Sequence, residues 1–187
     1  MVKSFYSDSE LAKIGFKSLG ENVQISRKAC IYGAERITIG NNVRIDDFCV
    51  LSGNITLGSY IHIAVYCALF GDKVGIEMED FSAISSRSVI YAKSDDYSGE
   101  SLTNPTVPEE YLKFIEGRVV IRKHVVVGSG TTILPGVEIG EGSAIGSMSL
   151  VNKALGAWGI YVGIPCQYKR ERSKKLLEME KELLSRR

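Results

Sequence analysis

The sequence has 187 residues, a formal net charge of +1 at pH 7 and 44% hydrophobic residues. That length favours one main domain, and the near-neutral charge gives no electrostatic reason to expect a nucleic-acid partner. No stretch approaches the roughly 20 apolar residues of a membrane span, and the start MVKSFYSDSE lacks the apolar run of a signal peptide.

A helical N-terminal cap is predicted over residues 1–18. Ser7, Asp8 and Ser9 are typical of a helix N-cap before Glu10-Leu11-Ala12-Lys13, and Gly15 and Gly20 would end the helix.

From residue 19 an aliphatic residue recurs every six positions. The pattern is strictest at Ile121, Val127, Ile133, Ile139, Ile145 and Val151. A period of six matches neither the 3.6 residues per turn of an α-helix nor the period of two of a simple strand. Three six-residue sides joined by tight corners make a coil of about 18 residues, and this period is typical of a parallel β-helix. We therefore expect an all-β solenoid over residues 19–168, with about six coils and one aliphatic per side pointing inward.

The six-residue period is interrupted in the first four coils, and each interruption is predicted to be a bulge at a corner. The interruptions fall at Glu35-Arg36, at Gly53-Asn54 and at Gly71-Asp72-Lys73. Between Lys93 and Gly117 the period is absent altogether. A connection of this length is usually functional or disordered, so we expect a protruding arm loop over residues 93–117, between coils four and five.

The outer faces of the three sides follow from the alternation of side chains along a strand, which turns the residue before each inward aliphatic outward. Side one carries Thr38, Thr56, Glu77, Val120 and Glu138. Side two carries Arg44, His62, Ala83, Val126 and Ala144, and side three carries Val50, Ala68, Val89, Thr132 and Leu150. Side three is almost wholly apolar and side two largely so. Since exposed apolar walls mark an interface, we expect a cyclic homotrimer in which sides two and three meet neighbouring subunits.

The tail and the cysteines complete the chain. Residues 169–187 are predicted to form a C-terminal helix with its leucines on one face, which would cap the open end of the solenoid or pack on a neighbouring subunit. The four cysteines show no metal-ligand spacing. Cys49 and Cys67 fall at small inward positions, so we expect buried free thiols and a cytoplasmic protein.

The run IRKHVVVGSGTTILPGVEIGEGSAIGSMSLVNK, followed by GIPCQYKR, resembles the C-terminal half of hexapeptide-repeat acetyltransferases. It is similar to the maltose and galactoside acetyltransferase group and to relatives that acetylate sugars for surface polysaccharides, such as those of lipopolysaccharide biosynthesis. The resemblance implies a left-handed β-helix and a trimer. It also implies transfer of an acetyl group from acetyl-CoA, without a metal, to a hydroxyl or amino group of a sugar or sugar nucleotide.

In that family acetyl-CoA lies in a groove between two subunits beside the C-terminal coils. The positions that match the groove here are Gly128, Ser129, Gly146, Ser147, Lys153, Pro165 and Arg170. Lys153 and Arg170 would face the CoA phosphates, where cations form charge-assisted hydrogen bonds. The glycines also serve the bends of the solenoid, and the two roles are compatible.

The catalytic base is where this sequence departs from the family. The family uses a histidine at the root of the arm, whereas this arm has no histidine and Asp95 falls at that position. The position of a family tyrosine near the acceptor sugar is His62, and a family aspartate that binds a sugar hydroxyl falls on Asp72. Tyr97 and Asn104 of the arm are expected to line the acceptor site.

Two candidate bases therefore remain, His62 and Asp95. Histidine, with a pKa of about 6.5, suits proton removal near neutral pH better than an ordinary aspartate, with a pKa of about 3.9. Asp96 beside Asp95 is a like charge that would raise the pKa of Asp95. An amine acceptor asks less of a base because its neutral form is already nucleophilic, so the missing histidine favours an amino sugar.

Three other functions are alternatives to a sugar acetyltransferase. A γ-class carbonic anhydrase shares this fold but needs three histidines around a metal, and the chain has only His62 and His124, of which His124 is expected to serve a turn. A non-catalytic scaffold would not need the arm or the groove-like corners. Acetylation of a hydroxylated antibiotic can be separated from sugar chemistry only by a substrate screen.

Overall fold

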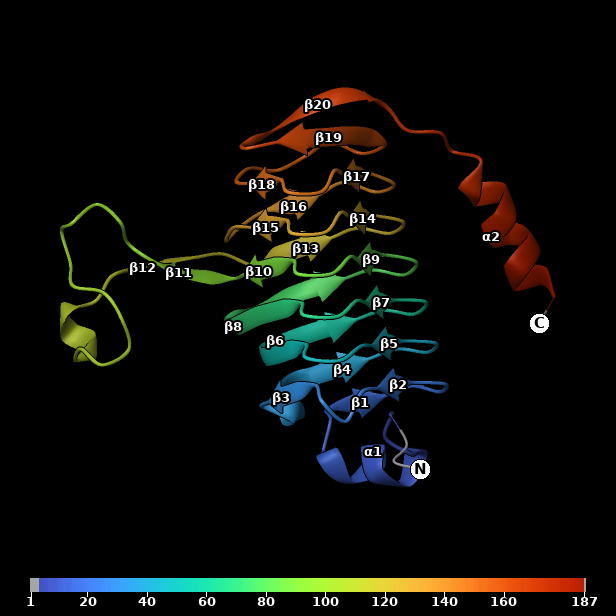
Figure 1. Cartoon of the computed structure of the whole chain (residues 1–187), viewed down its shortest axis with the longest axis horizontal. Coiled ribbons are helices and arrows are strands. Elements are labelled where there is room, and N and C mark those ends of the chain that lie inside the picture. The colour runs from blue at the N-terminus through green and yellow to red at the C-terminus, as the bar shows by residue number, and fades with distance from the viewer. Residues whose placement is uncertain (1–3, 187) are drawn as a thin grey trace.

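The computed structural model describes residues 4–186 and forms a prism of stacked coils with an arm on one side and a helix on the other (Figure 1). Helix α1 (Asp8–Ile14) lies under the first coil and ends at Gly15, whose φ is +84°. The Glu10 carboxylate accepts hydrogen bonds from the Arg27 side chain (2.5 Å) and the Ser7 backbone (2.8 Å), and these bonds hold the pKa of Glu10 at about 2. Within the predicted cap of residues 1–18, the helix occupies residues 8–14 and Ser18 already belongs to a strand, while residues 1–3 lie outside the described residues.

Side two is a sheet of eight strands. In order these are β2 (Gln24–Ile25), β5 (Arg44–Ile45), β7 (His62–Ile63), β9 (Ala83–Ile84), β14 (Val126–Val127), β17 (Ala144–Ile145), β19 (Gly159–Gly163) and β20 (Cys166–Glu171). Only β20 runs antiparallel, so the other seven strands mark seven coils. The sequence predicted about six, and the additional coil is the closing segment that contains β19.

Sides one and three belong to one sheet because two long strands turn the corner between them. These strands are β6 (Val50–Leu57) and β8 (Ala68–Met78). Side one is completed by β1 (Ser18–Leu19), β4 (Ile37–Ile39), β13 (Val119–Ile121) and β16 (Glu138–Ile139). Side three is completed by β3 (Cys30–Tyr32), β10 (Val89–Tyr91), β15 (Thr132–Ile133) and β18 (Leu150–Val151).

The strand register confirms the three predicted walls. Thr56 pairs with Thr38 and Glu77 on side one, and Ala68 pairs with Val50 and Val89 on side three. The inward aliphatics of the strict repeat are each at most 3% exposed, and burial of these side chains is the main source of stability of the solenoid. Cys49 and Cys67 are buried free thiols, and burial raises the pKa of Cys49 to about 12.

The corner between sides one and two is a ladder of residues with positive φ. Tyr60 stacks on Phe81 with ring centroids 4.4 Å apart, and Phe81 stacks on His124 at 5.3 Å. His124 has a φ of +61°, which confirms its predicted turn role.

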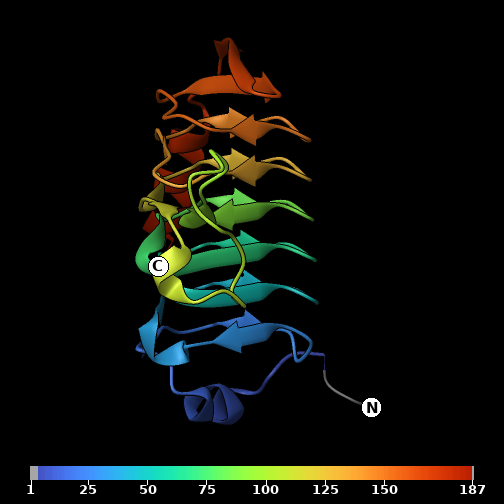
Figure 2. The same ribbon diagram turned by 90° about the vertical axis from the view of Figure 1, so that its left-hand side faces the viewer.

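The arm leaves the prism between coils four and five (Figures 1 and 2). Its root is a two-stranded antiparallel ribbon, in which β11 (Lys93–Asp95) pairs with β12 (Phe114–Glu116). A 3-10 turn, η2 (Glu109–Tyr111), lies farther out. The predicted excursion over residues 93–117 is therefore present, with an ordered root.

The tail differs from its prediction in the first residues. Residues 169–171, expected to be helical, belong to β20, which pairs with the edge of β19, and the helix α2 (Leu176–Ser185) begins five residues later. α2 turns back along the outside of the prism, where Glu180 binds His124 at 2.8 Å and Lys123 at 2.5 Å. The open end is thus covered by β20, and α2 packs on a corner of its own chain. Among the described residues, no helix has the length and apolar character needed to cross a bilayer.

Candidate active site

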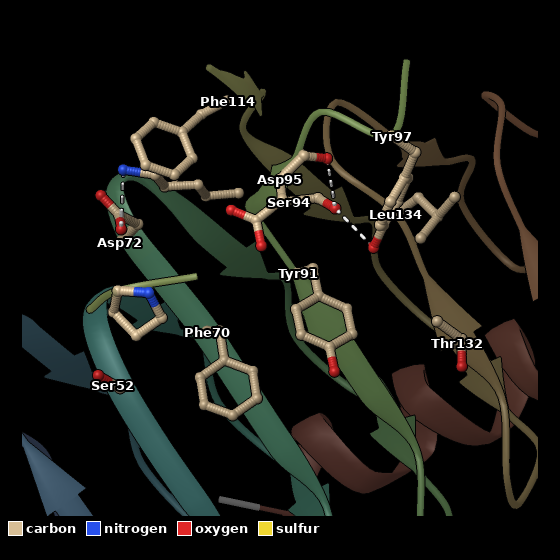
Figure 3. A pocket seen from close by; sticks show the side chains of 12 residues that line it. Ser52, Phe70, Asp72, Tyr91, Ser94, Asp95, Tyr97, Phe114, Thr132 and Leu134 are labelled. Atoms are coloured by element: carbon tan, nitrogen blue, oxygen red, sulfur yellow. Dashed lines mark hydrogen bonds and ion pairs between the residues drawn. The ribbon is translucent and has the colours of Figure 1, made fainter. Parts of the chain in front are cut away.

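The candidate active site is a pocket of about 780 Å³ between the root of the arm and side three (Figure 3). Strands β6, β8, β10, β11, β12 and β15 and the arm contribute its lining. The lining residues are Ser52, Phe70, Asp72, Tyr91, Lys93, Ser94, Asp95, Tyr97, Pro105, Phe114, Thr132 and Leu134. The pocket therefore joins the corner of coil three, the arm root and the apolar wall.

Aromatic rings form much of the lining. Phe70 and Tyr91 are register partners on neighbouring strands, and their rings stack with centroids 5.4 Å apart. Phe114, from the other strand of the arm root, has the Lys93 ammonium 3.6 Å from its ring centroid. Aromatic faces of this kind bind the apolar face of a sugar or a planar base. None of these three rings was predicted from the sequence to line the site.

Lys93 is a second residue that the sequence analysis missed. Its Nζ lies 3.1 Å from Glu116 Oε1 and 3.8 Å from Asp72 Oδ2, so it joins both strands of the arm root to the corner of coil three. The sequence feature that could have identified Lys93 is its position as the first residue of the predicted arm. Lys93 therefore fixes the arm root against the prism and neutralises part of the negative charge around it.

Three of the predicted acceptor-site residues come together in the pocket. Asp95 projects from β11, and no other residue of the described chain makes a hydrogen bond or ion pair with its carboxylate. Asp72 has a φ of +45° and accepts a hydrogen bond from the backbone of Lys73 at 2.6 Å. The hydroxyl of Tyr97 lies 3.3 Å from the Ser94 hydroxyl (Figure 3). The pocket thus holds an unpaired carboxylate, which is able to accept a proton from a bound group.

Asp96 does not join Asp95 in the pocket lining. Its carboxylate accepts hydrogen bonds from the Ser98 hydroxyl (2.6 Å) and backbone (3.0 Å) within the arm, and these bonds lower the pKa of Asp96. The two neighbouring carboxylates therefore have different surroundings, because successive side chains of a strand point to opposite faces.

Two predicted residues lie outside the pocket. His62 is on side two, half exposed, with Nε2 2.8 Å from Asp46 Oδ2. Burial raises the pKa of Asp46, but hydrogen bonds from His62 and Arg44 outweigh it and leave that pKa below its ordinary value. Asn104 forms a turn in the arm, where its side-chain oxygen accepts a hydrogen bond from the Thr106 backbone at 3.0 Å. Within one chain, His62 and Asp95 therefore stand on different walls.

The predicted donor residues lie in the upper coils, but not all on the same side. A Cβ atom on Gly128 would lie 2.5 Å from the Ser147 nitrogen, and one on Gly146 would lie 2.7 Å from Val162 Cγ1, so both glycines are required by packing. Ser129, Ser147, Lys153, Pro165 and Arg170 are exposed. Lys153 follows β18 at the corner between sides three and one, whereas the glycine–serine pairs occupy the corner between sides two and three. Arg170 lies in β20, in the sheet of side two, so the predicted donor residues are spread over more than one wall of a single chain.

No group of three or more histidine, cysteine, aspartate or glutamate side chains in the part of the chain that the structure describes has the arrangement of a metal site.

Comparisons with known proteins agree with this geometry. Residues 118–153 match the family model for the bacterial transferase hexapeptide (six repeats). The chain is 49% identical to the dTDP-4-amino-4,6-dideoxy-D-glucose acyltransferase of Escherichia coli, over 95% of this chain and 93% of the relative. It is 25% identical to the putative lipopolysaccharide biosynthesis O-acetyl transferase WbbJ of Escherichia coli K12, over 71% of this chain and 67% of the relative.

Solved structures of AntD, an N-acyltransferase from Bacillus cereus, superpose along nearly the whole chain. One, in complex with dTDP and 3-hydroxybutyryl-CoA, has a TM-score of 0.97 and 54% identity and covers 98% of both chains. Another, a serine-to-cysteine variant in complex with dTDP-4-amino-4,6-dideoxyglucose and coenzyme A, has a TM-score of 0.98 and 52% identity and covers 100% of both chains.

Proposed function

This chain belongs to the hexapeptide-repeat sugar acyltransferases, and on that basis we propose that it transfers an acyl group from acyl-CoA to the amino group of a dTDP-linked 4-amino-4,6-dideoxyhexose. The observation that carries the proposal is the free carboxylate of Asp95 in an aromatic pocket at the edge of side three. A carboxylate suits an amine acceptor, which needs less help from a base than a hydroxyl does. The two relatives of about half identity carry this kind of amino sugar in their names or bound ligands.

The proposed reaction is direct attack of the neutral amine on the thioester carbonyl. As the carbon–nitrogen bond forms, the nitrogen becomes acidic and gives one proton to Asp95, while the carbonyl oxygen takes up negative charge. The tetrahedral intermediate then collapses and its carbon–sulfur bond breaks, so the products are an amide and the CoA thiolate. The thiolate takes up the proton held by Asp95, which returns the carboxylate to its starting state.

The donor would approach along side three, between the two corners that border it. Gly128 and Gly146 leave the corner backbone open to the acyl-CoA arm, and Lys153 and Arg170 supply cations for its phosphates. The outward residues of side three need a cover, and a second copy of the chain in a trimer is the simplest one. That copy would bring its side two, with its own His62, toward the pocket, so His62 is assigned a supporting role across the subunit contact.

The substrates also suggest where the enzyme works. Acyl-CoA and nucleotide-linked sugars are soluble cytoplasmic metabolites, so we place the reaction in the cytoplasm, at a step before the modified sugar is built into a surface polysaccharide.

The test is a comparison of acceptors with the wild-type enzyme. Thiol release is measured with acetyl-CoA and 3-hydroxybutyryl-CoA, using dTDP-4-amino-4,6-dideoxyglucose and, as the matched control, the dTDP-sugar that carries a 4-hydroxyl. We expect turnover of the amino sugar at least about 100-fold faster, since a site built for one polar group discriminates strongly against another. A mass increase of one acyl group on the sugar nucleotide identifies the product. Equal rates for the two acceptors, or none for either, contradict the proposal.

A further inference from the structure

The interruptions of the six-residue period stack into a second hollow on the corner between sides three and one. The bulges are η1 (Ala34–Arg36), the bend at Gly53–Asn54 in β6 and the bend at Gly71–Lys73 in β8. They border a pocket of about 390 Å³, which we call the corner groove. Its lining residues are Lys17, Glu35, Arg36, Asn54, Asp72 and Lys73. The arm leaves the same side of the prism, from which β6 and β8 also start (Figure 1).

The corner groove holds three cationic side chains that have few ion-pair partners within the chain. Among residues 4–186, neither Lys17 nor Lys73 forms an ion pair, and Arg36 has only its sequence neighbour Glu35, at 3.5 Å. Many other cations of the body and arm are paired with a carboxylate. These include Lys28, Lys93, Lys113, Arg118 and Arg122. A concentration of unpaired cations in a concave surface favours an anionic ligand.

The backbone that carries these cations is tightly fixed. A Cβ atom on Gly53 would lie 2.4 Å from the Asp72 nitrogen, and one on Gly71 would lie 2.2 Å from the Asn54 carbonyl oxygen. The Lys17 N–H donates to the carbonyls of coil two, at 3.0 and 3.1 Å. The ammonium groups therefore extend from a preorganised corner rather than from a mobile loop, which reduces the entropy lost on binding.

The corner groove adjoins the acceptor pocket, because Asp72 lines both. If the sugar lies beside Asp95, the diphosphate attached to it can therefore reach the corner groove. We propose that Lys17, Arg36 and Lys73 bind the diphosphate of the nucleotide-linked acceptor sugar, which rests on the function proposed above. Diphosphates occur in both the acceptor nucleotide and CoA. The groove is assigned to the acceptor because it adjoins the Asp95 pocket and lies in coils one to three, below the donor corners.

The experiment measures binding of dTDP, thymidine and CoA by isothermal titration calorimetry to the full-length wild type and to K17Q, K73Q and the double variant. Each single substitution should weaken dTDP binding about threefold to tenfold, with CoA binding unchanged, because each removes one charge-assisted contact to phosphate. K73R should restore part of the affinity. The matched control is K181Q, which removes an equally exposed cation from α2. Wild-type binding of dTDP should also weaken as ionic strength rises.

Three outcomes overturn the proposal. They are unchanged dTDP affinity in the double variant, a parallel loss of CoA affinity that assigns the groove to the donor, and absence of dTDP binding to the wild type. The function proposed above is judged separately, by wild-type turnover of the amino sugar. Normal turnover and an unchanged KM for the sugar nucleotide in the double variant would remove the groove and leave the function intact.

Discussion

The lower and upper halves of the solenoid carry different kinds of site. In coils five and six the six-residue period is strict, and the corners are narrow stacks in which a Cβ atom on Gly128 or Gly146 would lie within 2.7 Å of the next coil. In coils one to four the corners bulge, and the chain leaves the prism altogether between coils four and five. Regular repetition builds a uniform wall, whereas each departure from it places particular side chains, such as Asp72 and Asp95, at one point of the surface.

The largest expected effect of a single substitution concerns the irregular lower half of the solenoid and its arm. Asp95→Asn removes the proposed proton acceptor but keeps the size and polarity of the side chain, so kcat at saturating acyl-CoA should fall by about 100-fold or more. The thermal midpoint should change little, because the carboxylate has no partner within the described chain. Asp96→Asn is the matched control, since that carboxylate is bound to Ser98, and it should retain turnover.

If D95N kept full turnover while H62A lost it, the proton would have to be assigned to the other wall. The proton acceptor would then be His62 of a neighbouring subunit, and the arm root would no longer hold the catalytic base.

The next largest effect concerns the regular upper half of the solenoid. Gly128→Ala places a methyl group 2.5 Å from the Ser147 nitrogen, so the variant should lose about 1–3 kcal/mol of stability and raise the KM for acyl-CoA. The KM for the acceptor should stay the same. Thermal unfolding and initial-rate kinetics measure the two quantities, with the adjacent exposed Ser129→Ala as the control. A rise in the acceptor KM alone would show that the halves are not separate.

A smaller effect concerns α2, which packs on the corner between sides one and two. Burial raises the pKa of Glu180, but hydrogen bonds from Lys123 and His124 outweigh it and leave the pKa below 4.5. The contribution of Glu180 to helix docking is therefore complete above its unfolded pKa and is lost as the pH falls through its folded pKa, below 4.5. Removing the charge by Glu180→Gln should cost about 1–3 kcal/mol at neutral pH.

The fluorescence of Trp158 is the readout for this prediction, since it is the one tryptophan of the sequence and its ring lies near His124 and Lys174. We expect E180Q to shift the emission at pH 7 toward the value that the wild type reaches in acid. E178Q, on the exposed face of the same helix, should not. An acid transition that persists unchanged in E180Q would exclude this pair as its origin.

The sequence predicted the prism well because a period of six residues determines which residues of successive coils are neighbours on each wall. It places residue 56 beside residues 38 and 77, and it therefore fixed which side chains face outward on each wall. The candidate residues Asp72 and Asp95 came instead from the family resemblance, and Tyr97 from its place in the arm. The period assigns His62 to side two, but it does not extend to Asp95, which lies in the arm where the period is absent.

The remainder of the pocket could not be predicted, because it depends on contacts that have no period. Lys93 meets Glu116 only because the two strands of the arm root pair across 23 positions of sequence. The charged run at residues 169–171 is compatible with a helix, but the free edge of β19 recruits it as a strand, so tertiary pairing overrides local preference.

The two ends of the stack are sealed by different means. At one end β20 occupies the hydrogen-bonding edge of the last coil, and at the other α1 buries Leu11 to 2% exposure against the first. The succession of parallel coils therefore stops at both ends, at an antiparallel strand on one and at a helix on the other. Another molecule of the same kind does not find a parallel coil to continue at either end, which disfavours filament growth along the long axis.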